Sequence, residues 1–291
     1  AARVVDRTGK GIRTAPRDAL VAQSSEQGKL GGSFGLHKML DMAGSSIGAF
    51  LAFLFVAKNM QYRTAFLWSI IPGVIGILLI PLVREERDTA QKNEKLSFRG
   101  LKLDNKLKLY LGVIFLFCLG NSSNTFLLLK AKSRGFTSSQ VMLLYLIFNL
   151  SAAILAIPSG KLSDRFGRSA ILVPGYLIYG LVYQGFALLT SKTGILLLFV
   201  AYGAYTAFIS GAERAFIAEA SPKEFKGTVL GLYGMLQGIG LLLSSAVAGV
   251  MWDKINSDAP FWFGGILGLL SAVAVAVILG YGRKAPKEAE I

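Results

Sequence analysis

Long apolar runs, separated by short polar connections, are the feature that most constrains what this chain can fold into. A helix needs about 20 apolar residues to cross the hydrocarbon core of a bilayer. The opening segment covers residues 1–24, and the runs that follow lie at about 33–57, 63–83, 108–130, 138–158, 169–189, 193–219, 227–251 and 260–281. Charged residues make up only 16% of the chain, whereas a soluble domain carries about a quarter. The pattern predicts nine transmembrane helices and an all-α integral membrane fold.

The basic residues predict how these helices are oriented. The formal net charge is +14, but the cations lie in connections between apolar runs, so the charge does not indicate nucleic-acid binding. If the longest connection, residues 84–108, is cytoplasmic, alternation of the helices places 17 Lys and Arg residues inside and seven outside. Cytoplasmic connections of membrane proteins are enriched in these two residues. We therefore expect a multi-pass protein whose C-terminus lies in the cytoplasm.

The residues that most enzymes use for chemistry are scarce in this sequence. Cys118 is the only cysteine and His37 the only histidine, so we expect neither a disulfide framework nor a zinc site. The sequence contains no nucleophile–base arrangement and no phosphate-binding loop with the required spacing. We predict no catalytic residue, no metal site and no cofactor, and a protein that is not an enzyme.

An internal repeat indicates two related halves. When the chain is aligned with itself at an offset of 196 residues, nine of the 26 positions from Ala19 to Gly44 are identical. This repeat predicts that the first three helices correspond to the last three of a six-helix unit. The complete architecture is then two six-helix halves, of which the chain contains helices 4–12. We expect the N-terminal half to end at residue 83, a cytoplasmic connection at 84–108, the C-terminal half at 109–283 and a cytoplasmic tail at 284–291.

The opening segment carries its charged residues on one side of the predicted helix. They fall within an arc of about 140° on a helical wheel. These residues are Arg3, Asp6, Arg7, Lys10, Arg13, Arg17 and Asp18. Each costs about 2.5–3.5 kcal/mol at the bilayer centre, so this face should meet a central cavity or partner helices. It forms either a wall that attracts an anionic solute or a structural network neutralised by acids on other helices, and Asp6 and Asp18 are candidates for carrying a proton.

Other polar residues lie within later spans. His37 and Asp41 could carry a coupling proton, or Asp41 could pair with Lys38 within the helix. Glu213 and Arg214 take the repeat positions of residues 17–18 and indicate either a solute or proton site or a structural ion pair. The uncharged candidates for lining a cavity are Asn121, Asn124 and Gln237.

The segment GKLSDRFGR at residues 160–168 carries a resemblance to a known family. It matches the cytoplasmic signature G-x-L-x-D-R-x-G-R of the major facilitator superfamily at Gly160, Leu162, Asp164, Arg165, Gly167 and Arg168. The match, together with two six-helix halves and the long central connection, makes the chain similar to that superfamily, and the segments DRTGKGIRTAPRDALVA and FGLHKMLDMAGSSIGAFLA resemble a poorly characterised bacterial branch. The resemblance implies a bacterial inner-membrane protein in which the signature braces one conformation.

The residues of the signature have physical reasons of their own. Gly160 permits a close approach of two helices, Asp164 can accept from a helix N-terminus or pair with cations, and Gly167 suits a tight turn. The alternative is an ordinary basic loop, which Arg165 and Arg168 alone would satisfy. The fifth helix keeps Gly44 and Gly48 of the family's exporter motif G-x-x-x-G-P-x-x-G-G but lacks its Pro and final glycines. That departure weakens an inference of drug export.

These features predict a secondary transporter that moves a small solute by alternating access, with a site between the two halves. The positive face of the opening segment favours an organic anion or another small polar solute, with protons as the expected coupling ion. The alternatives are a drug/proton antiporter and a membrane receptor or scaffold that does not transport. We expect a monomer in the bilayer whose partners are the solute and the coupling ion.

Overall fold

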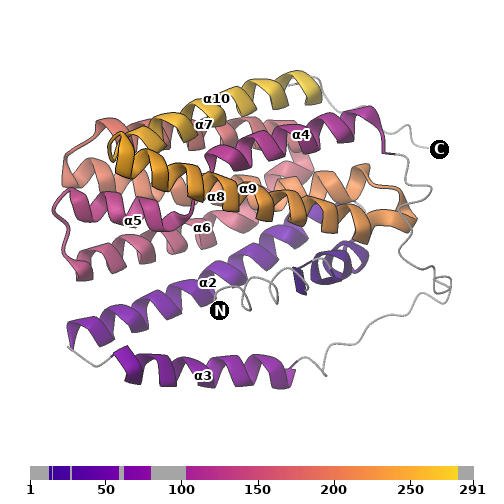
Figure 1. Ribbon diagram of the computed structural model, residues 1–291. Helices are drawn as coiled ribbons and strands as arrows, with labels where there is room; N and C mark the ends of the chain where they lie inside the picture. Colours follow the sequence, from indigo (N-terminus) through magenta and orange to yellow (C-terminus); the bar gives the residue numbers. More distant parts are fainter. Residues whose placement is uncertain (1–12, 15, 27, 59–61, 80–102, 281–291) are drawn as a thin grey trace.

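The computed structural model describes residues 13–14, 16–26, 28–58, 62–79 and 103–280, and the rest of the chain is drawn as a grey trace in Figure 1. Residues 13–14 and 16–23 are helical, followed by a short connection. The later helices are α2 (Leu30–Ala57), α3 (Tyr62–Leu79), α4 (Asn105–Gly120), α5 (Asn124–Ser133), α6 (Ser138–Phe166), α7 (Arg168–Leu188), α8 (Lys192–Ala220), α9 (Lys226–Lys254) and α10 (Ala259–Leu279). The described residues are therefore all-helical, as predicted.

Seven helical segments in the described part of the chain are long and apolar enough to cross a membrane. One of them, Asn105–Ser133, combines α4 and α5, and α3 contributes only a shorter apolar helix, Leu67–Leu79. Most of the first predicted span, residues 1–24, lies outside the described residues. The structure thus agrees with the predicted spans from residue 30 onward, with α3 shorter than expected in its described part.

Local signals fix where several helices begin and end. Thr137 and Gln140 form a capping box at the start of α6, and Ser191 caps α8 by accepting from the Gly194 N–H. Gly280, in a left-handed conformation, ends α10. These caps satisfy backbone groups at the helix ends that would otherwise be costly at the edge of a membrane.

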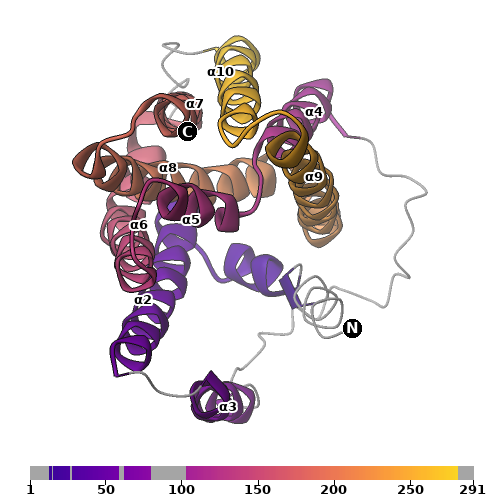
Figure 2. The ribbon, with the colours of Figure 1, turned by 60° about the vertical axis from the view of Figure 1, so that its left-hand side comes forward.

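The second half, α4–α10, has a core rich in aromatic side chains. Tyr176, Tyr179, Tyr183 and Phe117 are buried there, and the Phe117 ring lies edge-on to the rings of Tyr176 and Tyr179. α10 packs against α7 and α4, while α8 packs against α6 and α7 (Figure 2). Aromatic pairs of this kind add to the stabilisation that area burial provides.

The first half is represented by residues 13–23, α2 and α3. α2 packs along α6 of the second half, and its first turns also contact α8. α3 lies apart from the other helices in both views, and its large apolar side chains from Leu67 to Leu79 are exposed (Figures 1 and 2). The contact between halves is therefore made by residues 13–23 and α2. We call the end where α2 begins and α6 and α8 finish the predicted cytoplasmic end.

Candidate functional site at the contact between the halves

The signature segment is the last part of a helix and not a loop. α6 continues through Phe166, and Gly167 is the single residue between α6 and α7, with a φ of 91°. Such a positive φ is open to glycine and unfavourable for other residues. α6 therefore continues past the expected end of its span at residue 158, and the alternative of an ordinary basic loop does not describe most of residues 160–168. The continued helix holds Asp164 in a fixed direction.

Asp164 binds the N-terminus of α2 across the contact between the halves. Its Oδ1 accepts from the Gly31 N–H at 2.8 Å and its Oδ2 from the Gly32 N–H at 2.7 Å. The first turn of a helix has N–H groups without partners inside the helix, and the helix dipole favours an anion there. Hydrogen bonds to a charged group contribute about 1.5–3 kcal/mol each. Asp164 thus fastens the second half to the first.

Glycines allow this close approach. A Cβ atom placed at Gly31 would lie 2.6 Å from the Gly160 carbonyl oxygen and 2.7 Å from Asp164 Oδ1. A Cβ at Gly35 would lie 2.5 Å from the Ala156 carbonyl oxygen. Real Cβ atoms do not approach so closely, so any side chain at Gly31 or Gly160 would force the two helices apart.

Arg168 links this contact to α8. Its Nη1 donates to Asp164 Oδ1 at 2.7 Å and to Ser163 Oγ at 2.9 Å, and its Nε donates to Glu219 Oε2 at 3.0 Å. A second guanidinium nitrogen pairs with Glu219 Oε1. Arg165 is exposed, and its guanidinium lies 5.2 Å from the centre of the Phe166 ring. Of the two signature arginines, Arg168 alone takes part in the contacts described around Asp164.

A second ionic contact between the halves lies deeper in the bundle. Arg17 donates to Asp18 Oδ1 from Nε at 2.9 Å and from Nη2 at 2.8 Å. Arg214 of α8 approaches Asp18 Oδ2 to 2.9 Å, and Asp18 is 2% exposed. Asp18 and Arg214 occupy equal positions in the 196-residue repeat. The two copies of this position therefore meet at the contact between the halves.

Glu213, the neighbour of Arg214, faces the interior of the second half. It is 1% exposed and accepts from the Tyr176 hydroxyl at Oε1 and from the Tyr233 hydroxyl at Oε2, the latter at 2.5 Å. Gln237 Nε2 lies 3.5 Å from Oε2 and donates to the Tyr233 hydroxyl at 2.6 Å. Among the described residues, no cation forms an ion pair with Glu213. This carboxyl group is held by neutral donors.

The asparagine candidates lie where the predicted span at 108–130 is interrupted. Residues 121–123 are not helical and separate α4 from α5. Asn121 Nδ2 donates to the Tyr205 hydroxyl at 3.2 Å, and Asn124 Oδ1 accepts from the Tyr202 hydroxyl at 2.9 Å. Ser244 Oγ donates to the freed Asn121 carbonyl oxygen at 3.0 Å. A side chain of α9 thus satisfies a backbone group that the break exposes, as a membrane interior requires.

The remaining predicted residues are divided between the described and undescribed parts of the chain. Lys38 and Asp41 form an ion pair at 3.7 Å, and His37 Nδ1 is buried without a hydrogen-bond partner. Arg13 is exposed at the start of the described chain. The candidates that lie outside the described residues are Arg3, Asp6, Arg7 and Lys10. Their place relative to the contact is untested.

The ion pair in the connection after residue 23 is exposed to water, unlike the ion pair between Asp18 and Arg214. Glu26 and Lys29 form an exposed ion pair at 2.5 Å. The hydrogen bond and the charge of Lys29 lower the pKa of Glu26 below its ordinary value. Water screens such a pair, which contributes little to stability. The buried Asp18 and the partly buried Asp164 are the acids that join the halves.

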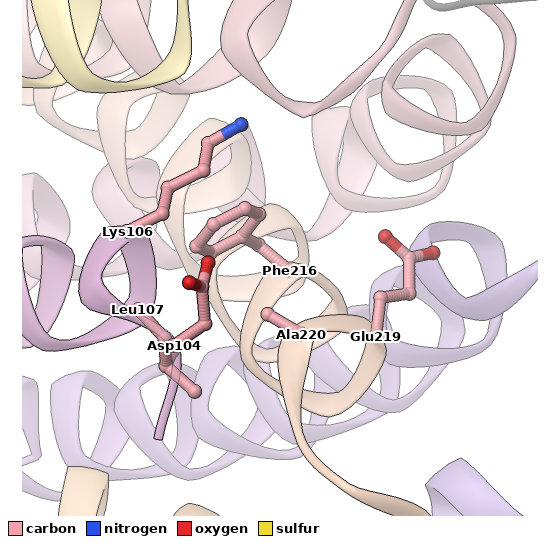
Figure 3. Close-up of a pocket in the computed structure, with 6 residues that line it drawn as sticks. All are labelled: Asp104, Lys106, Leu107, Phe216, Glu219 and Ala220. Carbon is pink, nitrogen blue, oxygen red and sulfur yellow. The ribbon is translucent and has the colours of Figure 1, made fainter. Parts of the chain in front are cut away.

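A cavity of about 250 Å³ lies beside this end of the bundle, between the start of α4 and the end of α8. Figure 3 shows Asp104 and Lys106 on one side of it and Glu219 on the other. Two acids and one lysine do not form an anion site. Within the described ranges, no cluster of three His, Cys, Asp or Glu side chains could hold a metal ion.

Sequence patterns alone did not identify several residues of these contacts. Gly31 and Gly32 bind Asp164 through their backbone N–H groups. Every residue except proline has such a group, so the sequence does not show that these two donate. Tyr176 and Tyr233 are single tyrosines in apolar spans, far from Glu213 in the sequence. Only the tertiary structure brings them to one carboxyl group.

Comparison with known proteins places these observations in a family. A family model described as Major Facilitator Superfamily matches residues 109–290. An uncharacterized MFS-type transporter of Methanocaldococcus jannaschii is 36% identical over 283 residues, which are 94% of this chain and 70% of that protein. The quinolone resistance protein NorA of Staphylococcus aureus is 26% identical over 53% of this chain and 39% of its own length. The crystal structure of the human organic anion transporter MFSD10 superposes with a TM-score of 0.70 at 16% identity, covering 90% of this chain and 67% of the other.

Proposed function

Because the chain belongs to the major facilitator superfamily, a family of membrane transporters and not of enzymes, we propose that it is the greater part of a secondary transporter that moves a small solute by alternating access. The observation that carries this proposal is the pair of contacts between the halves at one end of the bundle. Asp164 binds the start of α2, and Asp18 pairs with Arg214. Both must break if the halves separate there.

The arrangement corresponds to a conformation closed at the predicted cytoplasmic end. In our proposal Gly160, Asp164, Gly167 and Arg168 form the lock that stabilises it, while Arg165 supplies a positive charge at the membrane surface. Separation would expose the first N–H groups of α2 to water, which replaces Asp164 as their partner. Exchange of protein partners for water at an open end costs little net free energy, so a transporter can alternate between the two states.

For the solute, we favour an organic anion. Arg17 and Arg214 converge on the single carboxylate of Asp18, which leaves one excess positive charge at the contact. A guanidinium group that loses Asp18 on opening becomes available to bind a carboxylate or phosphate with two hydrogen bonds. The organic anion transporter MFSD10 shares the fold, which agrees with this choice without determining it.

Drug efflux is the second candidate. The similarity to NorA, a quinolone resistance protein, supports it, as do the aromatic side chains that surround Glu213. The uncharged side chains of Asn121, Asn124 and Gln237 could bind polar atoms of an organic anion or of a drug, so they do not distinguish the two candidates. A receptor or scaffold without transport is the third possibility, and a flux measurement distinguishes it directly.

The test is solute flux in proteoliposomes that contain the full-length protein. We expect anionic solutes to be transported, and Arg17→Ala to abolish anion transport while the protein remains folded. Arg13→Ala, at an exposed position in the same segment of the chain, is the matched comparison and should have a smaller effect. Unchanged anion transport in Arg17→Ala would overturn the anion proposal, and transport of cationic drugs alone would favour efflux.

The location in the cell is part of the proposal. We propose that the protein lies in the cytoplasmic membrane, with the connection at 84–108 and the C-terminus on the cytoplasmic side. A protease or membrane-impermeant label applied to intact cells should leave a C-terminal tag untouched. Modification of the tag in intact cells would reverse the orientation and with it the end at which Asp164 acts.

A further inference from the structure

Backbone carbonyl groups at the break between α4 and α5 are paired without the side chains of Asn121 and Asn124. The Tyr179 hydroxyl donates to the Gly120 carbonyl oxygen at 2.9 Å. Ser244 Oγ donates to the Asn121 carbonyl oxygen at 3.0 Å. Helices α7 and α9 thus supply the donors that a helix break inside a membrane requires. The amide groups of the two asparagines are therefore left for other contacts.

Each of these amide groups uses one of its two polar atoms on a tyrosine of α8. Asn121 Nδ2 donates to the Tyr205 hydroxyl at 3.2 Å, and Asn124 Oδ1 accepts from the Tyr202 hydroxyl at 2.9 Å. Among the described residues, no group forms a hydrogen bond with Asn121 Oδ1 or Asn124 Nδ2. The pair therefore presents one free acceptor, on Asn121, and one free donor group, on Asn124.

The two tyrosines place the amide groups next to each other. Tyr202 and Tyr205 are about one turn apart on α8, and their ring centroids lie 5.2 Å apart. Tyr202 also packs on Phe148 of α6, with 5.2 Å between the centroids, and Tyr205 packs on Tyr179 of α7 at 4.9 Å. The core thus holds both hydroxyls in place, and each hydroxyl determines which end of its amide is free.

The free atoms lie deep in the membrane. α4 is 16 residues long, so the break is about 24 Å from the start of this helix at the predicted cytoplasmic end. Asn121 and Asn124 are partly exposed, whereas their tyrosine partners are buried. An unpaired amide in contact with lipid is costly, so this exposed side has to face a polar cavity. While the cytoplasmic end is closed, alternating access opens that cavity to the opposite side of the membrane.

The free acceptor and the free donor together select the kind of group that binds. A carboxylate only accepts hydrogen bonds, so it fits Asn124 but not Asn121. An ammonium group only donates, so it fits Asn121 but not Asn124. A neutral group that both donates and accepts fits both atoms, and a hydroxyl group is the smallest such group.

From these observations we infer that Asn121 and Asn124 bind a hydroxyl group of the transported solute, which is then a hydroxylated organic anion. This inference rests on the proposed transport of an organic anion. The solute hydroxyl donates to Asn121 Oδ1 and accepts from Asn124 Nδ2. Tyr202 and Tyr205 are positioning residues, because they act through the two amides. The site acts while the cytoplasmic end is closed, before the ionic contact between the halves breaks.

Three monoanions that differ at one carbon atom test this site by equilibrium binding to the purified full-length protein. Lactate carries a hydroxyl group there, 2-methoxypropionate an ether oxygen and propionate a hydrogen atom. The ether keeps the acceptor for Asn124 but lacks the donor for Asn121. We expect the Kd to rise along this series, by about tenfold from lactate to propionate. If the wild-type protein binds none of the three, or binds lactate no more tightly than propionate, the inference is overturned.

Single variants separate the acceptor from the donor. With Asn121→Leu, lactate and 2-methoxypropionate should bind equally, and both more tightly than propionate. With Asn124→Leu, 2-methoxypropionate should bind no better than propionate, while lactate keeps an advantage from Asn121. Asn105→Leu, at the exposed first residue of α4, is the matched control and should leave all three Kd values unchanged. An equal loss of affinity for the three solutes in both site variants would show a structural role and overturn the inference.

The positioning role of the tyrosines is measured by selectivity. Tyr205→Phe removes the group that holds the Asn121 amide, and Tyr202→Phe does the same for Asn124. We expect each variant to lower the ratio of the propionate Kd to the lactate Kd by about threefold, with the propionate Kd unchanged. A ratio equal to that of the wild type in both variants would overturn the positioning role.

Flux measurements in proteoliposomes distinguish this inference from the proposed function. If lactate binds as expected but no solute crosses the membrane, the proposed function fails and the hydroxyl site stands. If lactate and propionate are transported with equal KM values by both the wild-type protein and Asn121→Leu, the hydroxyl site is overturned and anion transport stands.

Discussion

The two faces of α2 differ in how closely other helices approach them. On one face, Gly31 and Gly35 lie so near α6 that a Cβ atom would overlap its backbone. On the opposite face, a Cβ atom added at Gly44 or Gly48 would meet no atom of another described element within 4 Å, and Leu40 and Ile47 are exposed. The same residue type therefore serves contact between the halves on one face only. The difference shows which glycines of α2 pack against the second half in this conformation.

The strongest test of this difference is Gly31→Val. The added side chain would collide with the Gly160 carbonyl oxygen and with Asp164, so the closed state should lose about 3 kcal/mol, or roughly a hundredfold in population. Spin labels at Gln23 and Glu224, both exposed at the predicted cytoplasmic end, report the separation of the halves in a full-length Cys118→Ala background. The distance between these labels should shift to the open value, and solute exchange should fall with it.

Gly44→Val is the control for that experiment because it places the same side chain on the other face of the same helix. We expect its label distance to remain that of the wild-type protein. Equal shifts in the two variants would mean that valine disturbs α2 as a whole, and the comparison between the faces would fail.

Asp164→Asn should have the next largest effect. The amide keeps the shape of the side chain but loses the charge that binds the Gly31 and Gly32 N–H groups and Arg168. A hydrogen bond to a charged group contributes about 1.5–3 kcal/mol, so the closed population should fall about ten- to a hundredfold. Asp253→Asn, on the exposed end of α9, is the matched control, and the same label pair gives the measurement. A closed population equal to that of the wild type would show that helix packing alone holds this end together.

Much of this fold follows from the sequence because its signal is repeated many times. Spans of apolar residues predict the helices, and the exposed apolar face of α3 agrees with a lipid or protein environment. The end of α6 was missed because the polar residues Lys161 and Asp164 interrupt the apolar run. They remain helical because that face of α6 packs on α2 and not on lipid.

Some of the residues that the sequence singles out take part in the contacts between the halves, and their functional role stays a prediction. The signature pointed to Asp164 and Arg168, and the repeat pointed to residues 17–18 and 213–214. The pairing could not be deduced, because residue types do not show whether Arg214 reaches Glu213 or Asp18. That choice depends on which neighbour lies nearer once the helices pack, and the structure gives Asp18.

The ion pair between Asp18 and Arg214 is a second contact between the halves. Its removal tests whether the close packing of α2 on α6 is enough to keep this end closed. We expect Asp18→Asn and Arg214→Gln each to lower the closed population about tenfold, because each removes the ion pair that crosses the contact, although Asp18 keeps Arg17 in the second variant. In a double-mutant cycle, the two effects should not add, with a coupling of about 1 kcal/mol or more. Additive losses would separate Asp18 from Arg214 functionally, whatever their distance.

The smallest effect is expected for Gly48→Ala. A methyl group there meets no atom of the described residues, so the label distance and the thermal unfolding temperature should match those of the wild-type protein. Alanine also has a higher helix propensity than glycine, by about 0.8–1 kcal/mol, so any change in stability should be a gain. A loss of stability in the full-length protein would show that residues beyond those described pack against this face. The face of α2 that carries Gly44 and Gly48 would then also be in close contact with another segment, and the two faces would no longer differ in the full-length protein.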